Sequence, residues 1–404
     1  MNNDINDDTT PAALKPRRPG PMIVAVASAA ALIAGAVAFG AWSRIDAGGS
    51  EESPLTGRLQ NLVDAGFPAA LASATQANGV QTDVAVGKGD RESGSKPPVD
   101  GEVRIGSNTK MYVATIVLQL VEEGAVELDE PIETYLPGLV TGEGIAGGNI
   151  TVRQLMQHTT GLPEYANEIA ADAFGVQNTY LAPRALLDVA LEKPAVFPPG
   201  ERWEYSNTNY LVLGLLIENR TSRVLHEQIR ERIIEPLGLD HTYMPVPGDR
   251  SIRGAHPLGY HQDSEGQLRD ITEMDPSFAW AAGAMVTSPS DLNRFTQGLL
   301  SGELLSEASL DAMRSGVPAD DELWPGAHYG LGLQGFPLSC GGVAWGHGGD
   351  IPGTQTRNAV GPDGTAVTIA VTALPWALVD MTDEERLLEK YKIVVDALDE
   401  TLCD

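Results

Sequence analysis

The order of strand-like and helix-like apolar patterns along the chain most constrains its fold. Strand patterns lie near both ends, at residues 69–74, 82–87, 343–347, 354–360 and 365–372. Between these two groups, apolar residues recur with helical spacing, for example at residues 185–191, 210–220 and 224–234. This order predicts an α+β fold, in which both termini build one antiparallel sheet flanked by helices and an inserted, mostly helical region lies between them.

Three further helices are predicted from local signals. One covers residues 55–65, and another covers 107–123 and ends at Gly124, a residue suited to the left-handed position after a helix. The last begins at Thr382, where Thr382 and Glu385 form a capping box, and an apolar stripe follows it to Leu402.

The N-terminal segment predicts export. Residues 22–42 carry no charge and are numerous enough to cross a membrane as a helix. Basic residues precede this segment, so we expect a cytoplasmic tail at 1–21, a membrane anchor at 22–42 and everything beyond it outside. Cleavage as a signal segment is the alternative, because residues 36–38 suit a signal peptidase. In both cases a linker at 43–54 leads to one exported, extracytoplasmic domain at 55–404.

Charge and composition exclude several classes of function. The net charge of −28 argues against nucleic acid as a partner. Neither His256 nor His261 has the helical spacing of a metal site, and Cys340 and Cys403 are too far apart for a zinc knuckle. We therefore expect no metal and no cofactor. Both cysteines lie in the exported part, which favours a disulfide over two free thiols.

Ser107 and Lys110 carry the chemistry that the sequence indicates. A serine and a lysine three apart at the start of a helix share one face, so the amine can reach the hydroxyl and activate it. Burial in the apolar run that follows would lower the lysine pKa towards that of a usable base. A second Ser-x-x-Lys, Ser93 to Lys96, precedes two prolines in loop-like sequence and is interpreted as a loop.

Two later motifs offer further polar groups. Tyr205-Ser206-Asn207 presents a phenol to relay a proton and an amide to hold a substrate carbonyl or to orient Lys110. His347-Gly348-Gly349 follows a predicted strand, and its glycines allow close approach of a substrate. Taken alone, the first triplet is more typical of a buried tyrosine with a capping asparagine, and the second is more typical of a loop histidine. Similar triplets at 165–167 and 328–330 are interpreted as chance copies.

The order and spacing of the three motifs resemble those of the serine β-lactamase and DD-peptidase superfamily. The motifs are Ser107-x-x-Lys110, Tyr205-x-Asn207 and His347-x-Gly349. The resemblance is greatest to its class C-like branch of secreted D-alanyl-D-alanine carboxypeptidases. It extends through flanking stretches such as RIGSNTKMYVATIVLQLVEEG, ITVRQLMQHTTGLPEY and WAAGAMVTSPSDL, and it covers Leu55 to Asp404.

The resemblance implies a β-lactamase/transpeptidase-like fold and a role for each matched residue. It makes Ser107 the acylated nucleophile, Lys110 its base and Tyr205 the proton relay, and it counts His347 with them as catalytic. It implies further that Asn207 contacts the substrate amide, that His347 and Gly349 line the cleft edge, and that Trp280 lines the pocket wall. The backbone N–H groups of Ser107 and Asp350 would form the oxyanion hole, and Cys340 would form a disulfide with Cys403.

Three positions depart from the carboxypeptidase pattern. Where that branch places two hydroxyls and an arginine to bind the substrate carboxylate, this chain has Gly348, Asp350 and Gln334. A negatively charged substrate terminus would be repelled unless another cation compensates. The leading expectation is still a D-alanyl-D-alanine carboxypeptidase-type peptidase that acts on a small peptide such as a peptidoglycan stem peptide. The alternatives are an esterase, a D-amino-acid amidase, a class C-like β-lactamase and an inactive peptidoglycan-binding homologue.

Overall fold

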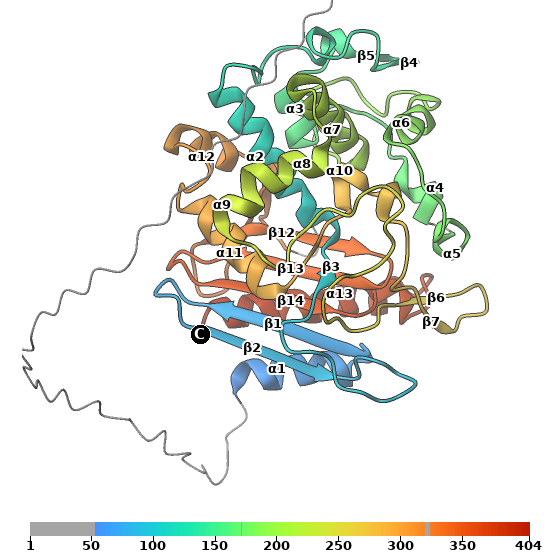
Figure 1. Ribbon diagram of the computed structural model, residues 1–404, viewed down its shortest axis with the longest axis vertical. Coiled ribbons are helices and arrows are strands. Elements are labelled where there is room, and N and C mark those ends of the chain that lie inside the picture. Colours follow the sequence, from blue (N-terminus) through green and yellow to red (C-terminus); the bar gives the residue numbers. More distant parts are fainter. Residues whose placement is uncertain (1–52, 171, 320–323) are drawn as a thin grey trace, which may run out of the picture. The chain divides into compact units, whose positions relative to one another are not determined.

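The two ends of the described chain meet in one eight-stranded antiparallel sheet, as predicted (Figure 1). Its strand order is β2-β1-β14-β13-β12-β11-β10-β9. The N-terminal strands therefore lie beside the last strand of the chain. The strands are β1 (Ala69–Thr75), β2 (Gln81–Gly87), β9 (Val317–Pro318), β10 (His328–Tyr329), β11 (Gln334–Pro337), β12 (Val343–Ile351), β13 (Thr354–Val360) and β14 (Ala366–Val371).

The computed structural model describes residues 53–170, 172–319 and 324–404. The predicted tail at 1–21, the predicted membrane segment at 22–42 and nearly all of the linker lie outside these residues. Across the three described ranges, every helix is too short or too polar to span a membrane.

Alternating residues of the sheet pack into two separate cores. Leu71 and its register partner Ala370 join the core formed with α2 (Thr109–Glu122), α7 (Asn207–Thr221) and α11 (Pro289–Leu300). Their neighbours Ala70 and Val371 face the opposite core with α1 (Pro54–Asp64) and α13 (Glu384–Leu402). This period of two is what a sheet covered on both faces requires.

The inserted region is mostly helical, as predicted (Figure 1). The predicted helices at 185–191 and 210–220 lie within α6 and α7, and the one at 224–234 forms α8 followed by a π-helical turn. Besides α7 and α11, the helices of this region are α3 (Val152–Gln157), α4 (Ala166–Ala170), α5 (Ala173–Val176), α6 (Pro183–Leu191), α8 (Leu225–Ile229), α9 (Glu235–Leu237), α10 (Trp280–Gly283) and α12 (Glu307–Arg314).

Short two-stranded sheets connect these helices. They pair β3 (Val103–Arg104) with β8 (Val286–Thr287), β4 (Thr141–Gly142) with β5 (Ile145–Ala146), and β6 (Tyr260–Gln262) with β7 (Leu268–Asp270). The first pair lies directly before the turn that carries Ser107, and so it helps to position the start of α2.

Two helix boundaries refine the predictions. The helix predicted from residue 107 begins as a 3₁₀ turn, Gly106–Asn108, and becomes α2 only at Thr109. The predicted capping box of the last helix is wrong: Asp383, not Thr382, caps α13 and accepts from the backbone N–H of Arg386. The hydroxyl of Thr382 donates to Asp380 instead.

Cys340 and Cys403 form a disulfide, as the resemblance implied. The bond joins the end of α13 to the turn between β11 and β12. It thus connects the C-terminus of the chain to the hairpin that leads to His347.

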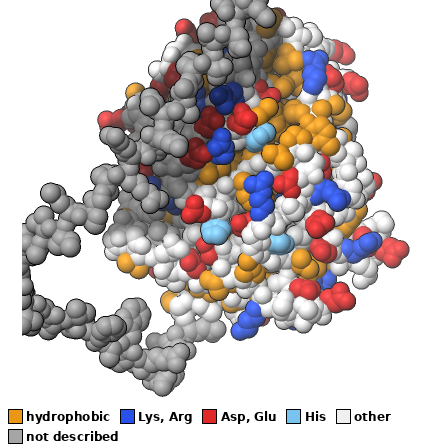
Figure 2. All heavy atoms as spheres, in the orientation of Figure 1, with side chains coloured by type: hydrophobic (Ala, Val, Ile, Leu, Met, Phe, Trp, Pro, Cys, Tyr) orange, Lys and Arg blue, Asp and Glu red, His pale blue; other side chains and the backbone are white. Residues whose placement is uncertain are grey.

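Charged side chains of both signs are interspersed on the face shown in Figure 2, and its basic residues do not gather into one patch. Such a face lacks the concentrated positive charge that binds a phosphate backbone.

Candidate active site

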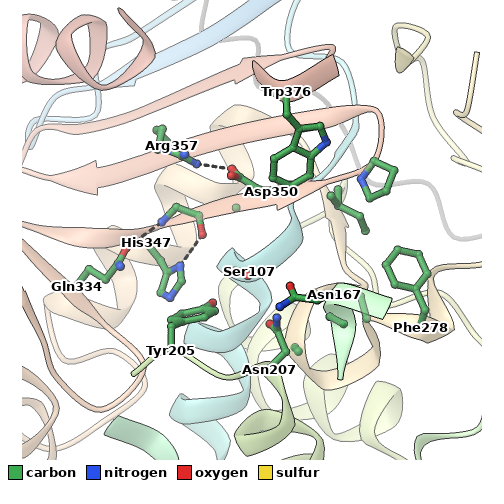
Figure 3. A pocket seen from close by; sticks show the side chains of 18 of the residues that line it. Ser107, Asn167, Tyr205, Asn207, Phe278, Gln334, His347, Asp350, Arg357 and Trp376 are labelled. Carbon is green, nitrogen blue, oxygen red and sulfur yellow. Dashed lines mark hydrogen bonds and ion pairs between the residues drawn. The ribbon is translucent and has the colours of Figure 1, made fainter. Parts of the chain in front are cut away.

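A cavity of about 340 Å³ lies where the start of α2, the start of α7 and strand β12 meet. Ser107, Tyr205, Asn207 and His347 all line it, so the fold brings the three predicted motifs together (Figure 3). The described residues that line the rest of the cavity include Phe278, Ala279, Gln334, Gly348, Asp350, Arg357 and Trp376.

The Lys110 amine has three hydrogen-bond partners. Its Nζ atom lies 3.0 Å from the Ser107 Oγ atom, 2.7 Å from Asn207 Oδ1 and 2.6 Å from the carbonyl oxygen of Ala282. The amide and the carbonyl oxygens can only accept, so a neutral amine donates its two hydrogens to them. Its lone pair then faces the hydroxyl of Ser107.

Burial makes this amine a base near neutral pH. Lys110 is fully buried, and the removal of its ammonium form from water lowers its pKa to about 7. The carboxylate of Glu164 opposes this shift, since a nearby negative charge favours the ammonium form. Lys110 can therefore take the proton of Ser107 without first needing an alkaline solution.

Glu164 orients Asn207 and has no counterpart in the sequence prediction. Its Oε2 atom accepts from the Asn207 backbone N–H at 2.7 Å and from the Asn207 side-chain amide at 3.0 Å. These bonds assign the amide so that its oxygen faces Lys110. Of the two roles considered for Asn207, the structure therefore shows the orientation of Lys110. The only sequence signal for Glu164 was its place in the stretch ITVRQLMQHTTGLPEY.

Tyr205 brings a buried phenol to the wall of the cavity. Burial raises the pKa of its phenol well above 10, although the nearby Ser107 hydroxyl opposes this shift. The phenol oxygen is buried and makes no hydrogen bond of standard geometry with the described residues. A buried hydroxyl in that state favours a ligand that completes its hydrogen bonding.

His347 lines the cavity but is not placed as a general base. Its Nε2 atom is hydrogen-bonded to the hydroxyl of Tyr329 at 2.9 Å, and its Nδ1 atom to the carbonyl oxygen of Gly348. Burial, together with the positive charge of Lys110, lowers the pKa of His347 to about 3. The predicted catalytic role is therefore corrected: a neutral imidazole with both nitrogens engaged positions the cleft edge.

The chain of hydrogen bonds behind His347 has a defined direction. The backbone N–H of Ser206 donates to Nδ1 of His158 at 3.3 Å, so the proton of the His158 ring lies on Nε2. This Nε2 donates to the hydroxyl of Tyr329 at 3.2 Å, and Tyr329 in turn donates to His347. Tyr329 belongs to the triplet 328–330, which the sequence analysis had set aside as a chance copy.

Two glycines let β12 approach the nucleophile closely. A Cβ atom on Gly349 would lie 1.9 Å from the carbonyl oxygen of Ile105, and one on Gly106 would lie 2.8 Å from the backbone nitrogen of Asp350. The backbone of Asp350 thus lies beside the start of the Ser107 turn. An oxyanion hole formed by the N–H groups of Ser107 and Asp350 requires such an approach.

The pocket wall differs from the prediction at two places. Trp280 is not among the described residues that line the cavity, because its ring packs against α7 at Gly214; Phe278 and Ala279 form that wall instead. The triplet 165–167, interpreted as a chance copy, does line the cavity, and Asn167 lies beside Asn207 in Figure 3.

The cavity also contains a cation that the sequence analysis did not find. Arg357 on β13 pairs with Asp350 at 2.7 Å between Nη1 and Oδ1 (Figure 3). The third departing position, Gln334, accepts from the backbone N–H of Gly348 at 3.2 Å. Arg357 is thus a cation in direct contact with Asp350, which is the exception that the expected repulsion of a substrate carboxylate allowed.

A serine activated by a buried lysine, beside a strand edge that can complete an oxyanion hole, defines a serine acyl-hydrolase. The chain belongs to the beta-lactamase family, whose sequence profile matches residues 32–391. The match covers all three motifs.

Solved structures similar to this chain include two amide hydrolases. A D-stereospecific amidohydrolase from Streptomyces sp. is 34% identical with a TM-score of 0.74, and the alignment covers 84% of this chain and 98% of that one. The D-amino acid amidase from Ochrobactrum anthropi SV3, complexed with L-phenylalanine amide, is 25% identical with a TM-score of 0.74, over 86% and 98% of the two chains.

Relatives with other names are matched over shorter stretches. A putative D-alanyl-D-alanine carboxypeptidase of Salmonella typhimurium is 29% identical over 202 residues, so that the match spans 46% of each chain, about half of the relative's length. Penicillin-binding protein 4 of Amycolatopsis lactamdurans is 26% identical over 292 residues, or 70% of this chain and 74% of that protein.

Proposed function

We propose that the protein is an exported serine amidohydrolase that cleaves the amide or ester bond on the carbonyl side of a D-amino acid through an acyl-enzyme at Ser107. The observation that carries the chemistry is the contact of Lys110 Nζ with Ser107 Oγ at 3.0 Å, while Asn207 and the Ala282 carbonyl oxygen hold the same amine. The D-stereospecificity is proposed from the amidohydrolase that is 34% identical over most of this chain.

In the proposed mechanism, Ser107 Oγ bonds to the substrate carbonyl carbon while its proton moves to Lys110. The carbonyl electron pair moves to the oxygen, which the N–H groups of Ser107 and Asp350 hold. The bond to the leaving nitrogen or oxygen then breaks, and that atom receives a proton through the Tyr205 phenol. Water attacks the acyl-enzyme in the same way and frees Ser107 with the acid product.

A D-alanyl-D-alanine carboxypeptidase is the second candidate. The three-motif resemblance and the relatives of that name favour it, whereas Gly348, Gln334 and the pairing of Asp350 with Arg357 favour a substrate without a free terminal carboxylate. A β-lactamase would share the acylation step but requires rapid loss of the acyl group.

A hydrolysis panel separates these activities. We would measure kcat/KM for a D-amino-acid amide, a short ester, a diacyl-Lys-D-Ala-D-Ala peptide and a cephalosporin, with Ser107→Ala as the control. Preference for the D-amide supports the amidohydrolase, and preference for the peptide supports the carboxypeptidase. A persistent penicillin adduct by mass spectrometry argues against a β-lactamase. No labelling of intact protein by a fluorophosphonate would contradict an enzyme of any of these kinds.

Export remains part of the proposal. The disulfide between Cys340 and Cys403 supports it, because such bonds persist in oxidising compartments. Fractionation of cells that express the full chain, followed by mass determination of the protein, tests it: a membrane-bound chain of full mass indicates an anchor, and a smaller secreted chain indicates a cleaved signal. Recovery of the full chain in the cytoplasm would contradict export.

A further inference from the structure

We infer that Asp350 is an internal carboxylate that occupies Arg357 and thereby selects substrates whose leaving group carries no negative charge. The inference rests on the proposed function, since it concerns the leaving-group side of the Ser107 cleft. It assigns to Asp350 and Arg357 a specificity role that the three motifs do not contain.

Arg357 reaches the cavity because Gly348 has no side chain. The two residues are register partners on β12 and β13, and a Cβ atom on Gly348 would lie 3.0 Å from Arg357 Nη1. The guanidinium therefore lies over Gly348 at the edge of β12, where it lines the cavity although only 10% of its side chain is exposed. A guanidinium held in this way is suited to bind a carboxylate.

Asp350 already provides that carboxylate. Its Oδ1 atom accepts from Arg357 Nη1 at 2.7 Å and from Gln355 Nε2 at 3.2 Å, so neighbouring side chains hold it in place. The Asp350 side chain is 27% exposed and lines the same cavity. In Figure 3 it points from β12 towards Arg357, between the strand edge and Trp376.

An incoming carboxylate would have to displace this bound one. Two carboxylates near one guanidinium repel each other, and removal of Asp350 from Arg357 would leave the displaced charge partly buried. A leaving group that ends in an amide, an ester or a continued peptide meets no such repulsion. The pair therefore discriminates by rejecting the wrong charge.

The inference predicts a gain of activity on a free acid when the internal carboxylate is removed. Two substrates share one scissile bond, N-acyl-D-Ala-D-Ala and N-acyl-D-Ala-D-alaninamide, and chromatography quantifies the D-alanine or D-alaninamide released. The wild type is expected to release D-alaninamide faster. In Asp350→Ala, the ratio of kcat/KM for the acid to that for the amide should rise about tenfold or more, since the substrate carboxylate can then accept the charged hydrogen bond that Asp350 accepts in the wild type.

Further variants separate this effect from general damage. Asp350→Asn keeps the size of the side chain and should also raise the ratio, though less. The double variant Asp350→Ala with Arg357→Gln should lose the gain, because the guanidinium that binds the acid is removed. Asp129→Ala, which breaks an exposed pair with Arg153 elsewhere on the chain, should leave the ratio at its wild-type value.

Hydrolysis of a neutral ester distinguishes the two possible failures. If the wild type cleaves the ester but both Asp350 variants keep the wild-type ratio, the masking of Arg357 is wrong and the proposed function stands. A wild type that prefers the free acid would also overturn it. If the wild type neither cleaves the ester nor accepts a fluorophosphonate on Ser107, the proposed function fails and the inference fails with it.

Discussion

The hydroxyl of Tyr329 donates to Nε2 of His347 across 2.9 Å and joins β10 to the strand that borders the cleft. The same hydroxyl accepts from His158. Because Tyr329 engages the nitrogen of His347 that would otherwise act as a base, the imidazole is a structural part of the strand edge. The backbone N–H of Asp350 lies three residues further along this strand.

Substitution of Tyr329 by Phe is expected to weaken both folding and catalysis. It leaves ring nitrogens of His158 and His347 without their partner in a buried place, which should lower the free energy of unfolding by about 1–3 kcal/mol. As His347 positions β12, we expect kcat for a neutral ester to fall while KM changes little. Urea denaturation and steady-state kinetics measure the two effects.

Tyr135→Phe is the matched control for this substitution. Tyr135 is also buried and its hydroxyl accepts one hydrogen bond, from the backbone N–H of Glu127, but it does not line the cavity. It should lose stability and keep its kcat. Equal values of kcat in the two variants would show that Tyr329 does not position the site.

Much of the scaffold was predictable because its signals are local. The period of two in the terminal strands and the apolar run after Lys110 depend on neighbouring residues, and both predictions are confirmed. The three motifs likewise identified residues that meet in one cavity. The cap predicted at Thr382 was wrong by one residue, because the position at which a helix begins is the least certain part of a pattern.

The residues that tune the site were not predictable in this way. Glu164 acts on Asn207 and Tyr329 acts on His347 across loops and strands whose approach no periodicity specifies. Arg357 is near Asp350 in sequence, but its effect depends on the pairing of β12 with β13 and on the missing side chain at Gly348. The contact of Arg357 follows from the register of β12 with β13, and that of Glu164 from how a loop packs on the start of α7; neither arrangement is specified by a sequence pattern.

The pKa of Lys110 sets the pH dependence of acylation. Only the neutral amine can take the proton of Ser107, and the pKa of Lys110 is lowered to about 7. We therefore expect kcat/KM for a neutral ester to rise about tenfold per pH unit below pH 7 and to level off above it. Measurement from pH 5 to 9 checks this, and a profile that keeps rising to pH 9 would contradict it.

The same lowered pKa also makes the stability of the fold depend on pH. Between pH 7 and 10.5 the unfolded chain keeps a proton on Lys110 that the folded chain has lost. The contribution of Lys110 to the free energy of unfolding should therefore rise with pH in this window, by up to about 1.4 kcal/mol per unit. Lys110→Met should lack this slope in urea titrations, and it should also lack activity.

Glu164→Gln should shift the activity profile to lower pH. The negative charge of Glu164 raises the pKa of Lys110 against the effect of burial, so its removal lowers that pKa further. Glutamine keeps an oxygen that can accept from Asn207, and we expect only a small loss of kcat at pH 8. Glu204→Gln removes the charge of an exposed carboxylate that pairs with Arg202, and it should leave the midpoint unchanged; an equal shift in both variants would contradict a specific effect.

The disulfide should contribute stability without contributing to catalysis. It closes a loop between residues 63 apart, which in the chain-entropy model corresponds to about 4 kcal/mol. We expect the double variant Cys340→Ser with Cys403→Ser to lose about that free energy of unfolding in urea. Neither cysteine lines the cavity, so kcat/KM of the folded variant should stay near the wild-type value. A large loss of kcat/KM would show that the bond also holds the β11–β12 hairpin in its active position.

Gly349→Ala and Gly348→Ala test the oxyanion hole through two adjacent residues of one strand. A methyl group at Gly349 would meet the backbone of Ile105 at 1.9 Å, which cannot give way unless β12 moves from the Ser107 turn. One at Gly348 would meet only the end of the Arg357 side chain, at 3.0 Å. Loss of one oxyanion donor lowers kcat by about 10²–10³-fold, and we expect a loss of that order on a neutral ester in Gly349→Ala alone. Circular dichroism confirms that both variants fold; similar values of kcat in the two would mean that the approach of β12 to Ser107 is not required for catalysis.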